Sequence, residues 1–201
     1  MGAADHTRRG PVVIVGAGPA GLVTAVTLAR QGVASLLVER NPALSPLPRA
    51  TAVSTRTLEL LRSFGLEDQV RAGQLELAAV GAWETETLAS PEGALVPLGQ
   101  PDFAEVAAAS PTTPAAVPQD HLEPVVLRHL EGLGLTEVRF DAELVALDQD
   151  ADGVTVVLRE SATGATQTVR AGYLVGADGA HCGPGPCSAS PWTAPTTCSS
   201  S

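Results

Sequence analysis

The chain has 201 residues, of which 44% are hydrophobic and 17% charged, a composition typical of a globular protein and not of a disordered one. Its net charge is −10, and all 12 basic residues are arginines without a basic cluster, which argues against nucleic-acid binding. The 3 cysteines all follow residue 181, so no disulfide framework supports the rest of the chain and a reducing cytoplasm is the expected compartment.

The polar residues 1–10 are predicted to form a flexible leader. Arg8 and Arg9 precede an apolar run over residues 12–29, an arrangement that superficially resembles a targeting signal. Glycines and a proline interrupt this run at a single point, where neither a membrane-spanning helix nor a signal peptide would place them. We therefore expect no membrane segment here.

Residues 11–40 predict one β-α-β unit. The apolar, β-branched run at residues 11–15 is typical of a buried parallel strand, and residues 35–38 form a second such run. Between them, residues 22–31 are expected to be helical, with Gly32 as the C-terminal stop. The whole unit has about thirty residues, the length that such a crossover requires.

The remaining chain predicts two helices, an irregular region and further strands. Helical spacing covers residues 55–64 and 121–131, while residues 75–118 are rich in proline and glycine and are interpreted as a β-rich excursion. A strand, a three-stranded meander and a last core strand are expected at residues 136–140, 142–148, 153–160, 166–173 and 173–175. The predicted fold class is α/β, a Rossmann-type parallel sheet with helices and an additional β meander.

The strongest functional signal is the motif Gly16-Ala17-Gly18-Pro19-Ala20-Gly21. Its first glycine permits a tight turn out of the strand, its second lets a diphosphate approach the backbone, and its third lets the helix pack closely. The free N–H groups and partial positive charge of the helix start would face the phosphates. Glu39 follows the second strand, where a carboxylate accepts hydrogen bonds from adenosine ribose hydroxyls and repels the 2′-phosphate of NADP. The motif therefore predicts a dinucleotide site and leaves NAD and FAD open.

Three later segments have the order and spacing of a known protein family. They are Pro48-Arg-Ala50 with Ser54–Glu59, Val117-Pro-Gln119 with His121–Glu123, and Tyr173–Gly179. Together with the glycine motif, they make the chain resemble the group A FAD-dependent monooxygenases, the flavoprotein family of aromatic and polyketide hydroxylases. The resemblance implies a three-layer FAD-binding domain over residues 11–181.

The resemblance assigns the glycine motif to the FAD diphosphate. It places Glu39 on the adenosine ribose and Arg40 beside the adenosine part. It places Arg49 near the diphosphate or flavin, Gln119 near the ribityl chain, and Asp178 near the phosphates and ribityl chain. The alternatives are a surface arginine, a helix cap and a turn residue, respectively. The full set of implied cofactor-binding residues is Gly16, Ala17, Gly18, Pro19, Ala20, Gly21, Glu39, Arg40, Arg49, Gln119, Asp178 and Gly179.

The resemblance also implies that the chemistry belongs mainly to the flavin, with NADPH or NADH as electron donor and an aromatic or polyketide-like substrate. No residue is assigned as an acid, base or nucleophile, and no metal site is predicted, because His121 and His129 lie eight positions apart on one expected helix. Two other functions stay open: a different FAD-dependent oxidoreductase, or a catalytically silent nucleotide-binding remnant. The absence of lysine argues against a halogenase, which needs one near the flavin.

Residues 182–201 depart from the family pattern, because Cys182, Pro184 and Gly185 stand where the family has a serine, a hydrophobic residue and an arginine. Read one base earlier, suitable codons for residues 187–200 encode a Leu-Gly-Ile-Pro segment that the family has near this place. We expect either a frameshift near residue 180 or a genuine disordered tail. In both cases we expect a truncated domain that holds FAD weakly or not at all and does not hydroxylate by itself.

Overall fold

The computed structural model describes residues 10–47, 49–75, 82–87, 89–96 and 103–179. The predicted tail, and the predicted leader apart from Gly10, lie outside these residues. Contacts divide the chain into two compact units, which are described separately below. Unit 1 comprises the described residues of 1–44 and 128–201, and unit 2 comprises those of 45–127.

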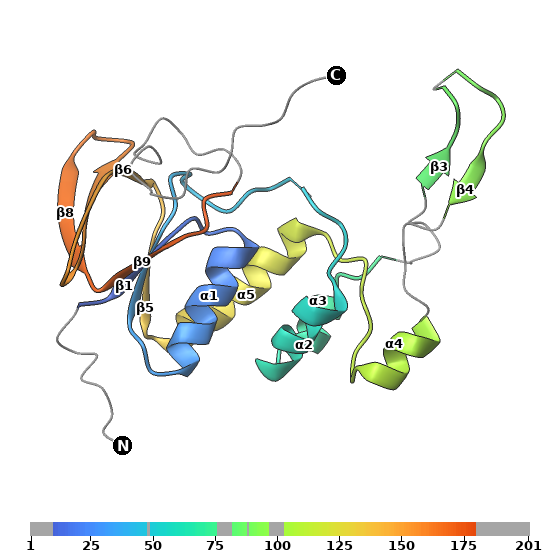
Figure 1. Ribbon diagram of the computed structural model, residues 1–201, viewed down its shortest axis with the longest axis horizontal. Coiled ribbons are helices and arrows are strands. Elements are labelled where there is room, and N and C mark those ends of the chain that lie inside the picture. The colour runs from blue at the N-terminus through green and yellow to red at the C-terminus, as the bar shows by residue number, and fades with distance from the viewer. Residues whose placement is uncertain (1–9, 48, 76–81, 88, 97–102, 180–201) are drawn as a thin grey trace. The chain divides into compact units, whose positions relative to one another are not determined.

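Unit 1 is built on a four-stranded, fully parallel sheet in the order β5-β2-β1-β9 (Figure 1). The central strand pairs in register on both sides, so that Val15 stands beside Val38 and Gly176. Val13 and Ile14 are fully buried, as expected for the middle of a parallel sheet. The strands are β1 (Val12–Val15), β2 (Ser35–Val38), β5 (Thr136–Arg139) and β9 (Tyr173–Gly176). The predicted β-α-β unit is confirmed.

Helix α1 (Pro19–Arg30) provides the crossover between β1 and β2. It begins at Pro19, three residues before the predicted start, because proline lacks the N–H that a first helical residue would leave unpaired. Gly18 is its N-cap in an extended conformation. The face that α1 buries is apolar and includes Leu22, Ala25 and Val26.

The predicted meander forms the third layer of unit 1, on the face of the sheet opposite to α1 (Figure 1). Its antiparallel strands are β6 (Ala142–Asp150), β7 (Gly153–Glu160) and β8 (Thr166–Ala171). Alternate residues of β7 point inward, and Val154, Val156 and Leu158 share one buried cluster with Val13 and Val38 of the parallel sheet. The three-layer arrangement is confirmed.

Strand β9 differs from the predicted core strand. It pairs with β1 on one side and is an edge strand of the described sheet. Tyr173 is 56% exposed, and Leu174 is only partly buried. An apolar run predicts a strand, but it does not distinguish an edge position from a central one.

Unit 2 is mainly helical. Helix α2 (Thr55–Ser63) is capped by Ser54, whose hydroxyl accepts a hydrogen bond from the Thr57 N–H at 3.3 Å, and it buries Leu58 and Leu61. The predicted β-rich excursion contains an antiparallel hairpin but also a helix that its composition did not predict. The other elements are α3 (Glu67–Arg71), β3 (Ala82–Glu84), β4 (Ala94–Val96), α4 (Phe103–Ala109) and α5 (Gln119–Leu133), which continues into unit 1.

Candidate functional site

The chain bends sharply at the carboxyl end of β1. Gly16 has φ +103°, a conformation that side chains strongly disfavour, and its N–H donates to the Val38 carbonyl at 2.7 Å. A Cβ added at Gly16 would lie 2.4 Å from the Ala177 carbonyl oxygen and 2.9 Å from the Asp178 Cα. Gly16 is therefore required for its backbone conformation and for the close approach of the segment that follows β9.

The other two glycines of the motif differ in their surroundings. A Cβ at Gly21 would lie 1.9 Å from the Gly16 carbonyl oxygen, so only glycine lets α1 pack this closely against the bend. A Cβ at Gly18 would meet no atom within 4 Å among the described residues. The first N–H groups of a helix have no intrahelical acceptor, and here they adjoin the open space at Gly18. The bend therefore fits a diphosphate.

Glu39 lies beside this bend. Its Oε2 accepts a hydrogen bond from the Ala17 N–H at 2.9 Å, and its Oε1 accepts from the backbone N–H and the side-chain amide of Asn41 at 2.9 and 2.6 Å. A carboxylate accepts about four hydrogen bonds, so capacity remains for a ribose hydroxyl. The sequence pattern identified Glu39 as a candidate but missed Asn41, whose only signal was its turn-forming neighbour Pro42.

Asp178 and Gly179 follow β9 at the same edge of the sheet. The Ala177 N–H donates to the Val15 carbonyl at 2.8 Å, which places the Asp178 backbone against Gly16. Gly179 has φ +83° and open space at its Cβ position. Arg40 is exposed next to Glu39. The structure thus brings the motif, Glu39, Arg40, Asp178 and Gly179 to the carboxyl ends of three neighbouring strands.

A cavity of about 670 Å³ in unit 1 includes none of these residues in its lining. It is bordered by the start of β2, by β5 and by β8. Its two arginines already have acidic partners, Arg139 with Glu137 at 2.7 Å and Arg170 with Asp150 at 2.6 Å. The bend, with its unpaired helix N–H groups, is therefore the better anion site.

Arg49 and Gln119 belong to unit 2, where each lies on one of two chain segments that backbone hydrogen bonds hold side by side. Val53 and Ala115 form an antiparallel bridge, and the Gln119 N–H donates to the Ala50 carbonyl at 2.8 Å. Gln119 is the first residue of α5, and its Nε2 donates to Glu123 Oε1 at 2.6 Å. A residue that stabilises the start of α5 would make this contact with Glu123. The assignment of Arg49 and Gln119 to the cofactor stays a prediction.

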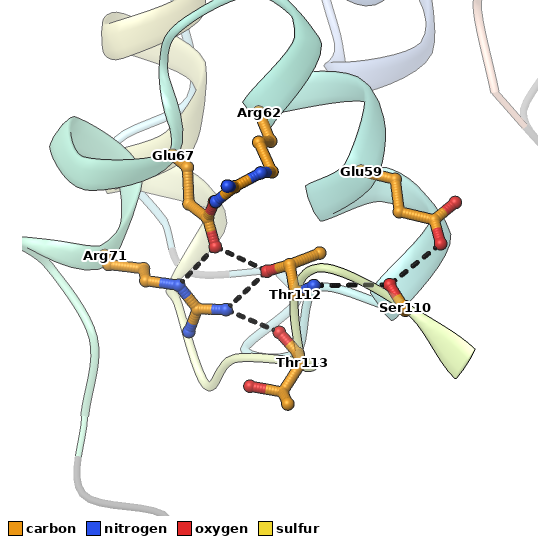
Figure 2. A network of polar contacts seen from close by, with 7 residues as sticks. All are labelled: Glu59, Arg62, Glu67, Arg71, Ser110, Thr112 and Thr113. Atoms are coloured by element: carbon orange, nitrogen blue, oxygen red, sulfur yellow. Dashed lines mark hydrogen bonds and ion pairs between the residues drawn. The ribbon is translucent and has the colours of Figure 1, made fainter. Parts of the chain in front are cut away.

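A polar network fixes residues 112 and 113, which lead into the segment that contains Ala115 and Gln119 (Figure 2). The Glu67 carboxylate accepts hydrogen bonds from Arg71 Nε at 2.9 Å, from an Arg62 Nη at 2.7 Å and from the Thr112 hydroxyl. Arg71 also donates to the Thr112 hydroxyl at 2.8 Å and to the Thr113 carbonyl at 2.6 Å. Residues 112–113 are therefore held to α3, two residues before the bridge at Ala115.

This network makes the stability of unit 2 depend on pH. Burial raises the pKa of Glu67, but hydrogen bonds from Thr112, Arg62 and Arg71 outweigh it and lower that pKa from 4.5 to about 2. The lowered pKa means that ionised Glu67 stabilises the fold above pH 4.5 and that this contribution is lost as the pH falls towards 2.

We expect Glu67→Gln to lower the free energy of unfolding at pH 7 by about 2 kcal/mol and to flatten the acid limb of the stability profile, because a partly buried carboxylate loses the charge that binds Arg62 and Arg71. The control is Glu137→Gln, since Glu137 is 61% exposed in its pair with Arg139 and should contribute less than about 1 kcal/mol. Urea unfolding between pH 3 and 8 measures both. Equal losses in the two variants would contradict a special role for Glu67.

The comparisons with known proteins agree with this geometry. The family described as the FAD binding domain matches residues 9–186. The chain belongs to this FAD-binding domain family. The predicted family and cofactor are confirmed, and the matched residues include the bend, Glu39 and the segment after β9.

Relatives of this FAD-binding domain include a hydroxylase and a monooxygenase. Aklavinone 12-hydroxylase of Streptomyces peucetius is 41% identical over 172 residues, which cover 84% of this chain and 35% of that enzyme. 2,4-Dichlorophenol 6-monooxygenase of Cupriavidus pinatubonensis is 37% identical over 188 residues, covering 85% of this chain and 29% of that enzyme. The chain spans about a third of the length of these relatives.

Solved structures show the same fold. The flavin-dependent monooxygenase PieE, in complex with FAD and substrate, matches with a TM-score of 0.75 and 40% identity over 86% of this chain and 30% of that one. Aklavinone-11 hydroxylase, in a complex with FAD and aklavinone, matches with a TM-score of 0.69 and 37% identity over 89% of this chain and 34% of that one. In the part of the FAD-binding domain that the structure describes, no helix is long and apolar enough to cross a membrane. Across the same residues, no group of three His, Cys, Asp or Glu side chains could hold a metal ion.

Proposed function

We propose that this chain is the FAD-binding part of an NAD(P)H-dependent monooxygenase that hydroxylates an aromatic or polyketide-like substrate. The observation that carries the proposal is the bend at Gly16, Gly18 and Gly21 with the Glu39 carboxylate hydrogen-bonded to it through Ala17. The substrate class is supported by the relatives, which are named as an aklavinone 12-hydroxylase and a 2,4-dichlorophenol 6-monooxygenase.

In this proposal, each described part of the site has one task. The first N–H groups of α1 bind the diphosphate, and Gly18 leaves room for its approach. Glu39 accepts hydrogen bonds from the adenosine ribose, and Asp178 with Gly179 lies beside the phosphates and ribityl chain. The bound flavin supplies the redox and oxygen chemistry, while the protein binds and orients it and excludes water. No side chain of this chain is assigned a proton-transfer role.

We further propose that NADPH or NADH acts as a transient electron donor and does not occupy the Glu39 site. The 201 residues correspond to about a third of the relatives, and we expect the chain by itself to hold FAD weakly or not at all and not to hydroxylate. Neither NADPH oxidation nor hydroxylated product should appear when the purified chain is mixed with FAD and an anthraquinone. NADPH-dependent product formation by the chain alone would contradict this expectation.

A chimera tests the function itself. Residues 10–179 of this chain would replace the matching part of aklavinone 12-hydroxylase, and the same chimera with Gly18→Val would serve as the control. We expect the first chimera to copurify with FAD and to oxidise NADPH in the presence of aklavinone, and the second to lack FAD. A folded first chimera without FAD would contradict the cofactor assignment. FAD incorporation without hydroxylation would contradict the monooxygenase assignment.

A further inference from the structure

The Glu39 carboxylate is held mainly by one neighbour. Of its three hydrogen bonds with described residues, two come from Asn41, whose backbone N–H and side-chain amide both donate to Oε1. The third comes from the Ala17 N–H to Oε2. Because a carboxylate oxygen accepts about two hydrogen bonds, Oε1 is saturated by Asn41 and Oε2 keeps the remaining capacity.

Asn41 is itself fixed by the turn between β5 and β6. Its carbonyl accepts a hydrogen bond from the Asp141 N–H at 3.0 Å. Asp141 has φ +60°, and no other described non-glycine residue has a positive φ. Its side chain accepts from the Ala162 N–H at 3.2 Å, and its carbonyl accepts from the Ser161 N–H at 3.0 Å. The left-handed turn at Asp141 therefore ties residue 41 to the meander.

This arrangement removes freedom from the Glu39 side chain before any ligand arrives. A glutamate has three rotatable side-chain bonds, and ordering them on binding costs entropy. The Glu39 backbone is also tied on both sides, since its N–H donates to the Arg139 carbonyl at 2.8 Å and its carbonyl accepts from the Ala142 N–H at 2.9 Å. With Oε1 taken by Asn41, the carboxylate can present only Oε2 to a ligand at the bend.

We propose that Asn41 is a positioning residue that orients the Glu39 carboxylate, so that Oε2 accepts a hydrogen bond from one hydroxyl of the adenosine ribose. This inference rests on the proposed function, because it assumes that Glu39 meets the ribose. It adds that hydroxyl recognition depends on a residue that does not itself contact the nucleotide. Arg40, which lies between Glu39 and Asn41 in the sequence, is exposed and is assigned no such role.

The test uses the full chain and three probes: ADP, 2′-deoxy-ADP and 3′-deoxy-ADP, with affinities measured by ligand-observed NMR. One of the two deoxy analogues lacks the hydroxyl that donates to Glu39. The unmodified chain should bind ADP about 10-fold more tightly than that analogue, because the analogue loses a hydrogen bond to a charged acceptor. Asn41→Ala should reduce this preference to about 3-fold or less while the affinity for that analogue changes less than about 2-fold. A merely structural role would weaken all three nucleotides together and overturn the proposal.

Two further variants sharpen the result. Asn41→Asp keeps the shape but removes the amide donor and places a second negative charge beside Glu39, so its preference for ADP should fall at least as far as that of Asn41→Ala. Gln149→Ala removes an exposed amide on β6, away from residues 39–41, and should bind like the unmodified chain.

The outcomes separate this inference from the proposed function. If the unmodified chain binds ADP and both deoxy analogues equally, or binds none of them, then Glu39 does not recognise the ribose and the proposed site falls with the inference. If the unmodified chain prefers ADP and Asn41→Ala keeps the full preference, only the role of Asn41 is overturned.

Discussion

Replacing Gly18 with valine should leave the domain folded and abolish FAD binding by the chimera that carries it. A side chain at this position meets no described atom within 4 Å, and the φ of −72° is one that any residue adopts. Valine is a poorer N-cap than glycine, so the free energy of unfolding should change by about 1 kcal/mol at most. The added side chain occupies the space through which a diphosphate would approach the first N–H groups of α1. We therefore expect the FAD affinity of the chimera with aklavinone 12-hydroxylase to fall about 100-fold or more when it carries Gly18→Val.

Two measurements on the Gly18→Val variant separate folding from binding. Thermal unfolding followed by circular dichroism should give a curve close to that of the unmodified chain. Flavin fluorescence during FAD titration of the chimera, with and without Gly18→Val, should show the loss of affinity. An unchanged FAD affinity would show that the diphosphate does not lie at Gly18, whereas an unfolded variant would show that the space at Gly18 is filled.

Gly21→Ala should have the opposite effect and destabilise the fold. The new methyl group would lie 1.9 Å from the Gly16 carbonyl oxygen, and a backbone atom at the bend cannot move away as a flexible side chain could. We expect a loss of about 3 kcal/mol or more in the free energy of unfolding, since α1 must separate from β1. Unfolding in urea measures this loss.

The matched control is Gly132→Ala. Gly132 is also helical, in α5, but it is exposed and a Cβ there would meet no described atom within 4 Å. Alanine should stabilise this helix by about 0.5–1 kcal/mol, because glycine loses more backbone entropy on folding. The same substitution is thus expected to change stability in opposite directions at the two positions. A stable Gly21→Ala variant would contradict the close packing of α1 on the bend.

The features that the sequence predicted well are those encoded by neighbouring residues. Apolar runs separated by a glycine-rich turn can form a parallel β-α-β unit, so β1, α1 and β2 were predictable. The separate tasks of Gly16, Gly18 and Gly21 followed from the same local pattern. The contacts at Gly16 and Gly21 agree with a tight turn and close helix packing, while the diphosphate approach at Gly18 stays a prediction. The turn between the strands predicted at residues 142–148 and 153–160 was likewise predictable, and the Asp150 carboxylate in it accepts from the Asp152 and Gly153 N–H groups at 2.8 and 3.0 Å.

The features that the sequence did not predict depend on residues far apart in the chain. The contact between Arg71 and Thr112 joins positions 41 residues apart, and no local pattern pairs them. The left-handed turn at Asp141 was also not predictable, because Asp141 contacts Asn41 only once the meander has folded. Helix α4 was missed because neighbouring prolines and glycines dominated the composition of residues 75–118.

The most direct test of the central claim is amide chemical-shift mapping of the isotope-labelled chain during titration with ADP, the adenosine diphosphate half of FAD. If the diphosphate binds the start of α1 and the ribose binds Glu39, the largest shifts should fall on residues 16–22 and 39–41. Shifts concentrated instead on residues 34–36, 134–137 and 139, which line the 670 Å³ cavity, would contradict the account.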